Sequence, residues 1–290
     1  MRLLDFNEFP VRKKTYGGAN GNKLSIIIDN ELYMLKLPSH ANKNENLSYA
    51  NSSISEYIGC LIYKSLGIKS QDTLLGTYIH NGTTRICVAC KDFEKDGYVL
   101  KDFASVKNQI IDSKSNGYGT NIVDILETIE KQTLVDSVEL SEYFWDMFVV
   151  DAIIGNWDRH NGNWGFLYNQ EIDEARIAPI YDCGSCLFPQ LDEDKMSKIL
   201  NDKQLFNARI YDFPTSAILK DGKRINYLSF IKSNEFSQCN KAIERIKEKF
   251  IFSEIESIIN NIECISKIQK EFFIKIIKAR SDAIFQHWYL

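Results

Sequence analysis

Residues 144–184 read FWDMFVVDAIIGNWDRHNGNWGFLYNQEIDEARIAPIYDCG. An apolar run ends at Gly155-Asn156, and a dense polar cluster occupies residues 158–163. A short apolar segment, a polar turn and a second apolar segment follow, and the stretch closes at Asp182-Cys183-Gly184. The pattern predicts an apolar helix, a polar loop and a β-hairpin that ends in an Asp-x-Gly turn.

This order of elements suits phosphoryl transfer. One carboxylate accepts the proton of the attacking hydroxyl, an Asn five residues later holds a metal ion, and an Asp on the next hairpin holds metal across the nucleotide phosphates. Asp158 is therefore the candidate catalytic base, and Asn163 and Asp182 are the candidate metal ligands. The Asp-x-x-x-x-Asn spacing alone has a simpler interpretation, because both residue types commonly bond to their own backbone in loops.

The composition is that of an ordinary globular protein, with 290 residues, 44% hydrophobic content and a formal net charge of −4. This charge gives no overall basic field for nucleic acid, so we expect no direct nucleic-acid binding. The N-terminus has no apolar core of a signal peptide, and no apolar stretch reaches the roughly 18 residues of a membrane span. We expect a cytoplasmic protein by default, although export without a classical signal peptide would leave no mark in the sequence.

A glycine-rich loop near the N-terminus lies between predicted strands at residues 10–16 and 24–28. Glycines there let backbone N–H groups approach phosphate oxygens closely, and a lysine near the end of the following strand, Lys36, can reach the same phosphates. The simpler interpretations are a plain β-turn and a surface lysine at a strand edge. The candidate phosphate-binding residues of the loop are Gly18, Ala19, Asn20, Gly21 and Asn22.

A helix is predicted over residues 52–66, with apolar side chains spaced for one buried face. Glu56 in its first turn has two interpretations. It can pair with Lys36, as the helix glutamate of kinases does, or it can complete a capping box that begins at Ser53. A β-hairpin over residues 73–90 follows, turning at Asn81-Gly82.

Seven cysteines include two Cys-x-x-Cys pairs, Cys87/Cys90 and Cys183/Cys186. The pairs lie far apart in sequence, whereas zinc ribbons place theirs about 15–20 residues apart. Residues three apart on a strand also point to opposite faces, which is poor geometry for chelation. We interpret the cysteines as structural.

GNWDRHNGNWGFL followed by APIYDCGSCLFP resembles the HipA-like serine/threonine kinases of bacteria, and within them the short, stand-alone members. The likeness runs from GGANGNK at residue 17 to helices expected near residues 237–250, 253–263 and 265–286. The order of residues in the loop is specific to this family, because Arg159 and His160 follow the catalytic Asp, whereas His and Arg precede it in ordinary protein kinases.

The resemblance implies further site residues. Cys90 would belong to the hinge where backbone groups meet adenine, with Asp92 as a loose counterpart of an acidic family residue. His160 would contact phosphate or metal-bound oxygens, unless local hydrogen bonds hold it, and Tyr181 would pack beside the nucleotide. Arg159 can stabilise transferred charge or, as we prefer, pair with a helix carboxylate; Asp151 on the preceding apolar stretch is interpreted as structural.

We therefore predict an α+β, two-lobed protein-kinase-like fold, with a β-rich N-lobe at residues 1–92, a mostly helical C-lobe at residues 93–290 and the nucleotide in a cleft between them. The predicted activity is a serine/threonine protein kinase that uses ATP and Mg²⁺ and phosphorylates a protein, with itself as one acceptor. The alternatives are a small-molecule or lipid kinase, a toxin–antitoxin-type kinase, and a nucleotide-binding protein without activity. A small antitoxin or a host protein is the expected kind of partner.

Overall fold

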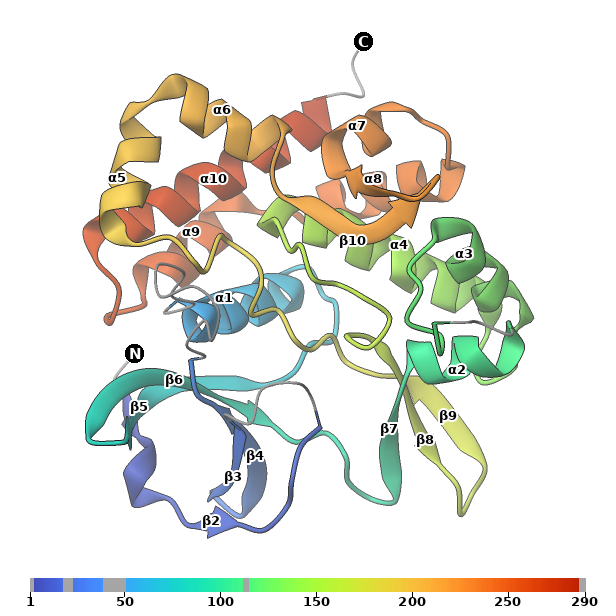
Figure 1. Ribbon diagram of the computed structural model, residues 1–290, viewed down its shortest axis with the longest axis horizontal. Coiled ribbons are helices and arrows are strands. Elements are labelled where there is room, and N and C mark those ends of the chain that lie inside the picture. Colours follow the sequence, from blue (N-terminus) through green and yellow to red (C-terminus); the bar gives the residue numbers. More distant parts are fainter. Residues whose placement is uncertain (1–2, 18–22, 39–50, 112–114, 287–290) are drawn as a thin grey trace. The chain divides into compact units, whose positions relative to one another are not determined.

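Two short, largely apolar strands, β3 (Lys23–Ile28) and β4 (Glu31–Lys36), pair as an antiparallel hairpin. The turn between them places Asp29 and Asn30 in the left-handed region, at φ 49° and 63°, which Asp and Asn tolerate better than most residues. The computed structural model describes residues 3–17, 23–38, 51–111 and 115–286 (Figure 1). The predicted loop residues Gly18, Ala19, Asn20, Gly21 and Asn22 lie outside these ranges.

Contacts divide the chain into two compact units, the first formed by Met1–Phe93, Cys183–Lys203 and Ile251–Lys275. Its centre, among the residues that the structure describes, is a six-stranded sheet in the order β1-β5-β6-β4-β3-β2, in which β1 and β5 run parallel and the other neighbours run antiparallel. The hairpin at Asn81-Gly82 is confirmed, since β5 and β6 pair antiparallel from Thr73↔Cys90 to His80↔Thr83. The remaining elements of this unit are β1 (Leu4–Asp5), the 3₁₀ helix η1 (Phe6–Glu8), β2 (Val11–Arg12), α1 (Ser52–Ser65), β5 (Thr73–His80), β6 (Thr83–Lys91), α5 (Glu193–Asn201) and α9 (Phe252–Asn260).

Helix α1 is buried over most of its length because it packs against β5, β6 and α9. Asn51 precedes the helix and bonds to two later segments of the chain. Its Nδ2 donates to the Leu191 carbonyl at 2.7 Å, and its Oδ1 accepts from Gln269 Nε2 at 3.0 Å. The first unit is therefore held together by residues that lie more than a hundred positions apart.

The second unit comprises Glu94–Asp182, Gln204–Phe250 and Ile276–Leu290. Helix α4 (Ser137–Ile154) is its most apolar element and packs against α3 and α8. The helix begins at Asp136, whose side chain accepts from the Glu139 N–H, and it ends at Gly155, which has φ 66°. The other elements are β7 (Tyr98–Asp102), α2 (Phe103–Ile110), α3 (Ile122–Lys131), β8 (Gly165–Asn169), β9 (Glu174–Ile177), α6 (Lys203–Tyr211), β10 (Thr215–Lys220), β11 (Lys223–Asn226), α7 (Tyr227–Lys232) and α8 (Ser237–Lys249).

The predicted fold class is confirmed as a mixed α and β chain with a β-rich N-terminal sheet and a mostly helical C-terminal part. The C-terminal helices fall close to their expected positions, as α8, α9 and α10 (Lys267–Phe285). The strand expected at residues 10–16 is wrong in extent, because only Val11 and Arg12 pair with β3 and both are exposed. The lobe boundaries at residues 1–92 and 93–290 stay a prediction. Within the described residues, no helix is long and apolar enough to cross a membrane.

Candidate active site

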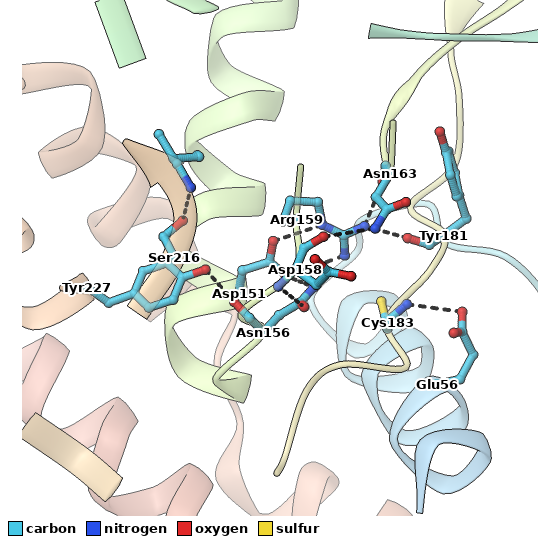
Figure 2. A network of polar contacts seen from close by, with 11 residues as sticks. Glu56, Asp151, Asn156, Asp158, Arg159, Asn163, Tyr181, Cys183, Ser216 and Tyr227 are labelled. Carbon is cyan, nitrogen blue, oxygen red and sulfur yellow. Dashed lines mark hydrogen bonds and ion pairs between the residues drawn. The ribbon is translucent and has the colours of Figure 1, made fainter. Parts of the chain in front are cut away.

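The predicted catalytic loop begins where α4 ends, and its geometry depends on a buried ion pair. Arg159 Nε lies 2.9 Å from Asp151 Oδ2, and neither side chain is more than 2% exposed. The same guanidinium donates from Nη1 to the Asn163 carbonyl at 2.7 Å and to the Tyr181 carbonyl (Figure 2). Pairing of Arg159 with a helix carboxylate is thus confirmed. One arginine ties the helix, the loop and the segment before Asp182 together.

Asp158 and Asn163 are joined through the backbone. Asn163 Nδ2 donates to the Asp158 carbonyl at 2.8 Å, which commits the nitrogen side of the amide to the loop. Within the described residues, the Asn163 Oδ1 accepts no hydrogen bond, and no side chain or N–H donates to the Asp158 carboxylate. The loop therefore leaves these oxygens available to other groups.

Burial raises the pKa of the Asp158 carboxyl, and the nearby charge of Asp182 raises it further. His160, Arg224 and Arg159 act in the opposite direction, and burial prevails. Asp182 itself has φ 57°, a left-handed backbone that is strained for a residue other than glycine. Such strain persists only where the surrounding structure holds it, and it is common at functional sites.

His160 makes one of the local hydrogen bonds that the simpler interpretation expects. Its Nδ1 accepts from the Gly162 N–H at 3.0 Å, and its ring meets the Tyr118 ring edge-on at 6.4 Å between centroids. A neutral imidazole with an accepting Nδ1 carries its proton on Nε2. The Nε2–H is then the atom through which His160 could contact a phosphate.

Tyr181 is only 9% exposed, and its hydroxyl donates to the Gly162 carbonyl at 3.0 Å. This contact fastens the segment before Asp182 to the end of the catalytic loop. The packing of Tyr181 beside a nucleotide stays a prediction.

In the first unit, the expected ion pair between Lys36 and Glu56 forms. Lys36 Nζ lies 3.0 Å from Glu56 Oε2, and the Glu56 side chain is 1% exposed. Glu56 Oε1 accepts from the Cys183 N–H at 3.1 Å (Figure 2). A Cβ placed on Gly184 would lie 3.1 Å from Glu56 Oε2. The capping-box interpretation is wrong, because α1 begins at Ser52 after Asn51 and no side chain caps it.

The segment expected to form the hinge is bonded to the irregular segment that follows β2. Asp92 accepts from Lys14 Nζ at 2.6 Å and from the Tyr16 hydroxyl at 2.8 Å, and its N–H donates to the Leu32 carbonyl at 2.8 Å. Cys90 is fully buried in β6. Nothing in the sequence indicated these contacts, because Asp92 lies 78 positions from Lys14 and 76 positions from Tyr16.

Asn156 and Tyr227 are further site residues that sequence reasoning missed. Asn156 Nδ2 donates to Asp151 Oδ1 at 3.0 Å, and its Oδ1 accepts from the Asp158 N–H at 3.2 Å. The Tyr227 hydroxyl donates to the Asn156 carbonyl at 2.6 Å. An Asn directly after a helix-ending Gly could have indicated the first contact, whereas nothing in the sequence pointed to Tyr227.

All seven cysteines are free thiols, and all except the partly exposed Cys264 are buried. The side chains of Cys183 and Cys186 lie against Gly59 of α1, where an added Cβ would come within 2.7 Å of Cys183 Cβ. A hydrogen bond with Cys183 and burial raise the pKa of the Cys60 thiol well above its usual range. In the part of the chain that the structure describes, no three His, Cys, Asp or Glu side chains form a metal cluster. The burial of six of the thiols and the packing of Cys183 and Cys186 against α1 are consistent with the structural interpretation of the cysteines.

Comparisons with known proteins give the family. The model of the HipA-like C-terminal domain matches residues 15–264. The serine/threonine-protein kinase CtkA of Helicobacter pylori is 45% identical over 287 residues, which cover 98% of this chain and 87% of that protein. The crystal structure of a proinflammatory kinase CtkA of the same species matches with a TM-score of 0.91 and 43% identity, covering 99% of this chain and 98% of that chain.

HipA of Shewanella oneidensis, solved with HipB and operator DNA, matches with a TM-score of 0.52 and 12% identity over 95% of this chain and 66% of that chain. This identity is low enough that the match shows the fold alone. The resemblance seen in the sequence is confirmed by the family model and the CtkA comparisons together. The chain therefore belongs to the HipA-like C-terminal domain family, as an enzyme of the serine/threonine kinase class.

Proposed function

We propose that this enzyme transfers the γ-phosphoryl group of ATP to a Ser or Thr hydroxyl of a protein, with Asp158 as the base. The observation that carries the proposal is the hydrogen bonding around the Asp158 carboxylate. It lies on a loop fixed by buried hydrogen bonds, yet no described residue donates to it. A carboxylate held in place and left without a donor is suited to accept the proton of a substrate hydroxyl.

The acceptor hydroxyl gives its proton to Asp158, and its oxygen forms a bond to the γ-phosphorus. The bond from the γ-phosphorus to the bridging oxygen breaks, and ADP leaves with that electron pair. Because burial raises the pKa of Asp158, the carboxylate is a stronger base than an exposed Asp.

Asn163 and Asp182 would hold Mg²⁺. Amide and carboxylate oxygens are the ligands that this small, hard cation prefers, and the Asn163 Oδ1 accepts no hydrogen bond within the described residues. When bound, the ion would neutralise charge on the phosphate oxygens. The left-handed backbone at Asp182 is consistent with a residue held in place for such a role.

Lys36 would neutralise the α- and β-phosphates, and Glu56 would hold it in position through their ion pair. We assign the backbone of residues 18–22 to the same phosphates and the backbone at Cys90 to the adenine. His160 would donate from Nε2 to a phosphate oxygen, and Tyr181 would line the nucleotide site. The acceptor includes the enzyme itself, and a small antitoxin or host protein stays the predicted partner.

The test is the intact mass of the protein after incubation with Mg-ATP, with the isosteric variant Asp158→Asn beside the wild type. We expect phosphate gain in the wild type and a loss of about 10²–10⁴ in rate for the variant. The control is Asp194→Asn, which removes an exposed carboxylate in the first turn of α5. Near-normal transfer by Asp158→Asn would rule out Asp158 as the base.

A second arm identifies the class of acceptor. Labelled ATP is offered with a mixed protein extract and, separately, with a metabolite and lipid pool. Label in protein that depends on Asp158 supports the proposal. Label that appears only in small molecules or lipids would instead favour the alternative kinase class.

A further inference from the structure

The hairpin of β10 and β11 bonds directly to the catalytic loop. Arg224 on β11 donates from Nη2 to the carbonyl of Trp157, the residue immediately before Asp158. The same guanidinium donates from Nε to the Ser216 carbonyl on β10 at 2.8 Å. One planar group thus links the hairpin backbone to the peptide that carries the proposed base.

A second contact from the same part of the fold holds the neighbouring peptide. Tyr227 follows β11 directly and is 1% exposed, and its hydroxyl donates to the Asn156 carbonyl. Figure 2 shows Tyr227 pointing toward Asn156, with Ser216 beside it. Two consecutive carbonyls before Asp158 therefore accept hydrogen bonds from side chains of the hairpin region.

The other side of the catalytic loop is fastened to the segment at residues 115–121. Asn161 Nδ2 donates to the Gly117 and Gly119 carbonyls at 2.8 and 2.9 Å. That segment in turn bonds to the hairpin, because the Leu219 N–H donates to the Thr120 carbonyl at 2.8 Å. The loop, the segment and the hairpin are mutually bonded, and all three lie in the second unit.

We propose that Arg224 is a positioning residue for phosphoryl transfer, which sets the direction of the Asp158 carboxylate by holding the Trp157 carbonyl. The inference rests on the proposed role of Asp158. A guanidinium suits this task because its fixed fork donates to two carbonyls at once, whereas an ammonium is a single point charge. A misplacement of about 1 Å at a reacting group can cost about 10²-fold in rate, so a bond next to the base has a large effect.

The experiment compares Arg224→Gln and Arg224→Lys with Lys223→Gln as the matched control. Lys223 is the neighbouring residue on the hairpin and is exposed, and it has no contact with the catalytic loop among the described residues. We expect kcat to fall about 10- to 10²-fold in Arg224→Gln and to be only partly restored in Arg224→Lys. The KM for ATP and the rise in melting temperature caused by Mg-ATP should stay close to the wild type in both.

A fall in kcat with an unchanged KM distinguishes a positioning role of Arg224 from a role in folding alone. A merely structural role would lower the melting temperature while leaving kcat unchanged well below it, and that result would overturn the inference. Unchanged kcat in Arg224→Gln would overturn it as well. Tyr227→Phe, which removes only the hydroxyl, should also lower kcat, by a smaller factor.

The double variant Asp158→Asn/Arg224→Gln distinguishes this inference from the proposed function. If Arg224 acts through Asp158, adding its substitution to Asp158→Asn should cause little further loss. If the activity loss of the double variant equals the product of the two single losses, the positioning role is wrong, and the proposed base is unaffected. Near-normal turnover by Asp158→Asn alone would refute the proposed function, and the inference would fail with it.

Discussion

Glu56 is a buried carboxylate with two different donors, the Lys36 ammonium and the Cys183 N–H. A glutamine at this place keeps an acceptor for the N–H but removes the charge that holds the lysine. Hydrogen bonds to charged groups contribute roughly 1.5–3 kcal/mol. The Glu56 side chain therefore connects helix α1 to strand β4 and to the turn after Asp182.

We expect Glu56→Gln to lower kcat/KM for ATP by about 10- to 100-fold, because Lys36 loses the partner that orients it toward phosphate. Steady-state kinetics with varied ATP measures this. The control is Asp72→Asn. It removes the charge of an exposed carboxylate that pairs with Lys64 of α1, and it should leave kcat/KM unchanged. Normal kinetics in Glu56→Gln would show that the Lys36–Glu56 pair has no part in nucleotide use.

Arg159 is the second residue whose contacts predict a large effect. Arg159→Gln leaves the buried Asp151 carboxylate without its counter-ion, which typically costs about 3–5 kcal/mol of folding free energy. Urea unfolding followed by tryptophan fluorescence measures the change. Lys131→Gln, which breaks an exposed pair with Glu127, should leave the unfolding midpoint nearly unchanged. Equal midpoints for the two variants would contradict the structural role of the Arg159–Asp151 pair.

At the scale of elements, the segment at residues 115–121 approaches helix α2 so closely that only glycine fits. Gly117 has φ 78°, and a Cβ on it would lie 1.8 Å from the Ala104 carbonyl oxygen. Gly82 in the β5–β6 turn has nearly the same backbone, φ 73°, but no atom within 4 Å of such a Cβ. Alanine substitutions at these two glycines therefore distinguish the cost of a left-handed backbone from the cost of a steric clash.

We expect Gly82→Ala to lose about 1–2 kcal/mol, the cost of a left-handed L-residue, and Gly117→Ala to lose clearly more. Gly117→Ala should also lower kcat, because Asn161 of the catalytic loop bonds to the Gly117 carbonyl. Urea midpoints and single-turnover rates well below the melting temperature measure both effects. A Gly117→Ala variant as stable and as active as Gly82→Ala would refute the close approach.

For the whole molecule, the first compact unit is assembled from three separate stretches of chain. Phe188 packs edge-on against Phe272, with 6.1 Å between the ring centroids. Asn51 bonds to both Leu191 and Gln269. Residues 183–203 and 251–275 thus supply part of the core into which α1 and the sheet are packed. The β-rich N-terminal segment by itself lacks these apolar surfaces.

We therefore expect a fragment of residues 1–93 to show no cooperative thermal unfolding, whereas the full chain should unfold cooperatively. Apolar faces that stay exposed to water do not offset the conformational entropy lost on folding. Circular dichroism during heating measures this for both proteins. A cooperative transition in the fragment would mean that the later segments are dispensable for the sheet and α1.

The sequence by itself determined the features that depend on neighbours along the chain. The apolar run and Gly155 end α4 at the right place, and Asn81-Gly82 fixes the β5–β6 turn, because helix and turn chemistry is local. The order of Asp158, Asn163 and Asp182, with Arg159 and His160 after the Asp, was enough to indicate the family.

Only the tertiary structure decided which partners distant side chains meet. Glu56 had a plausible local role as a helix cap, and the long-range contact with Lys36 prevailed because packing of α1 buries the carboxylate beside the strand. The contacts of Arg224 with Trp157 and of Lys14 with Asp92 bridge 67 and 78 positions. No periodicity or turn signal encodes such pairs, because they depend on how the folded elements pack, and burial then makes each unpaired charge or N–H costly enough to fix its partner.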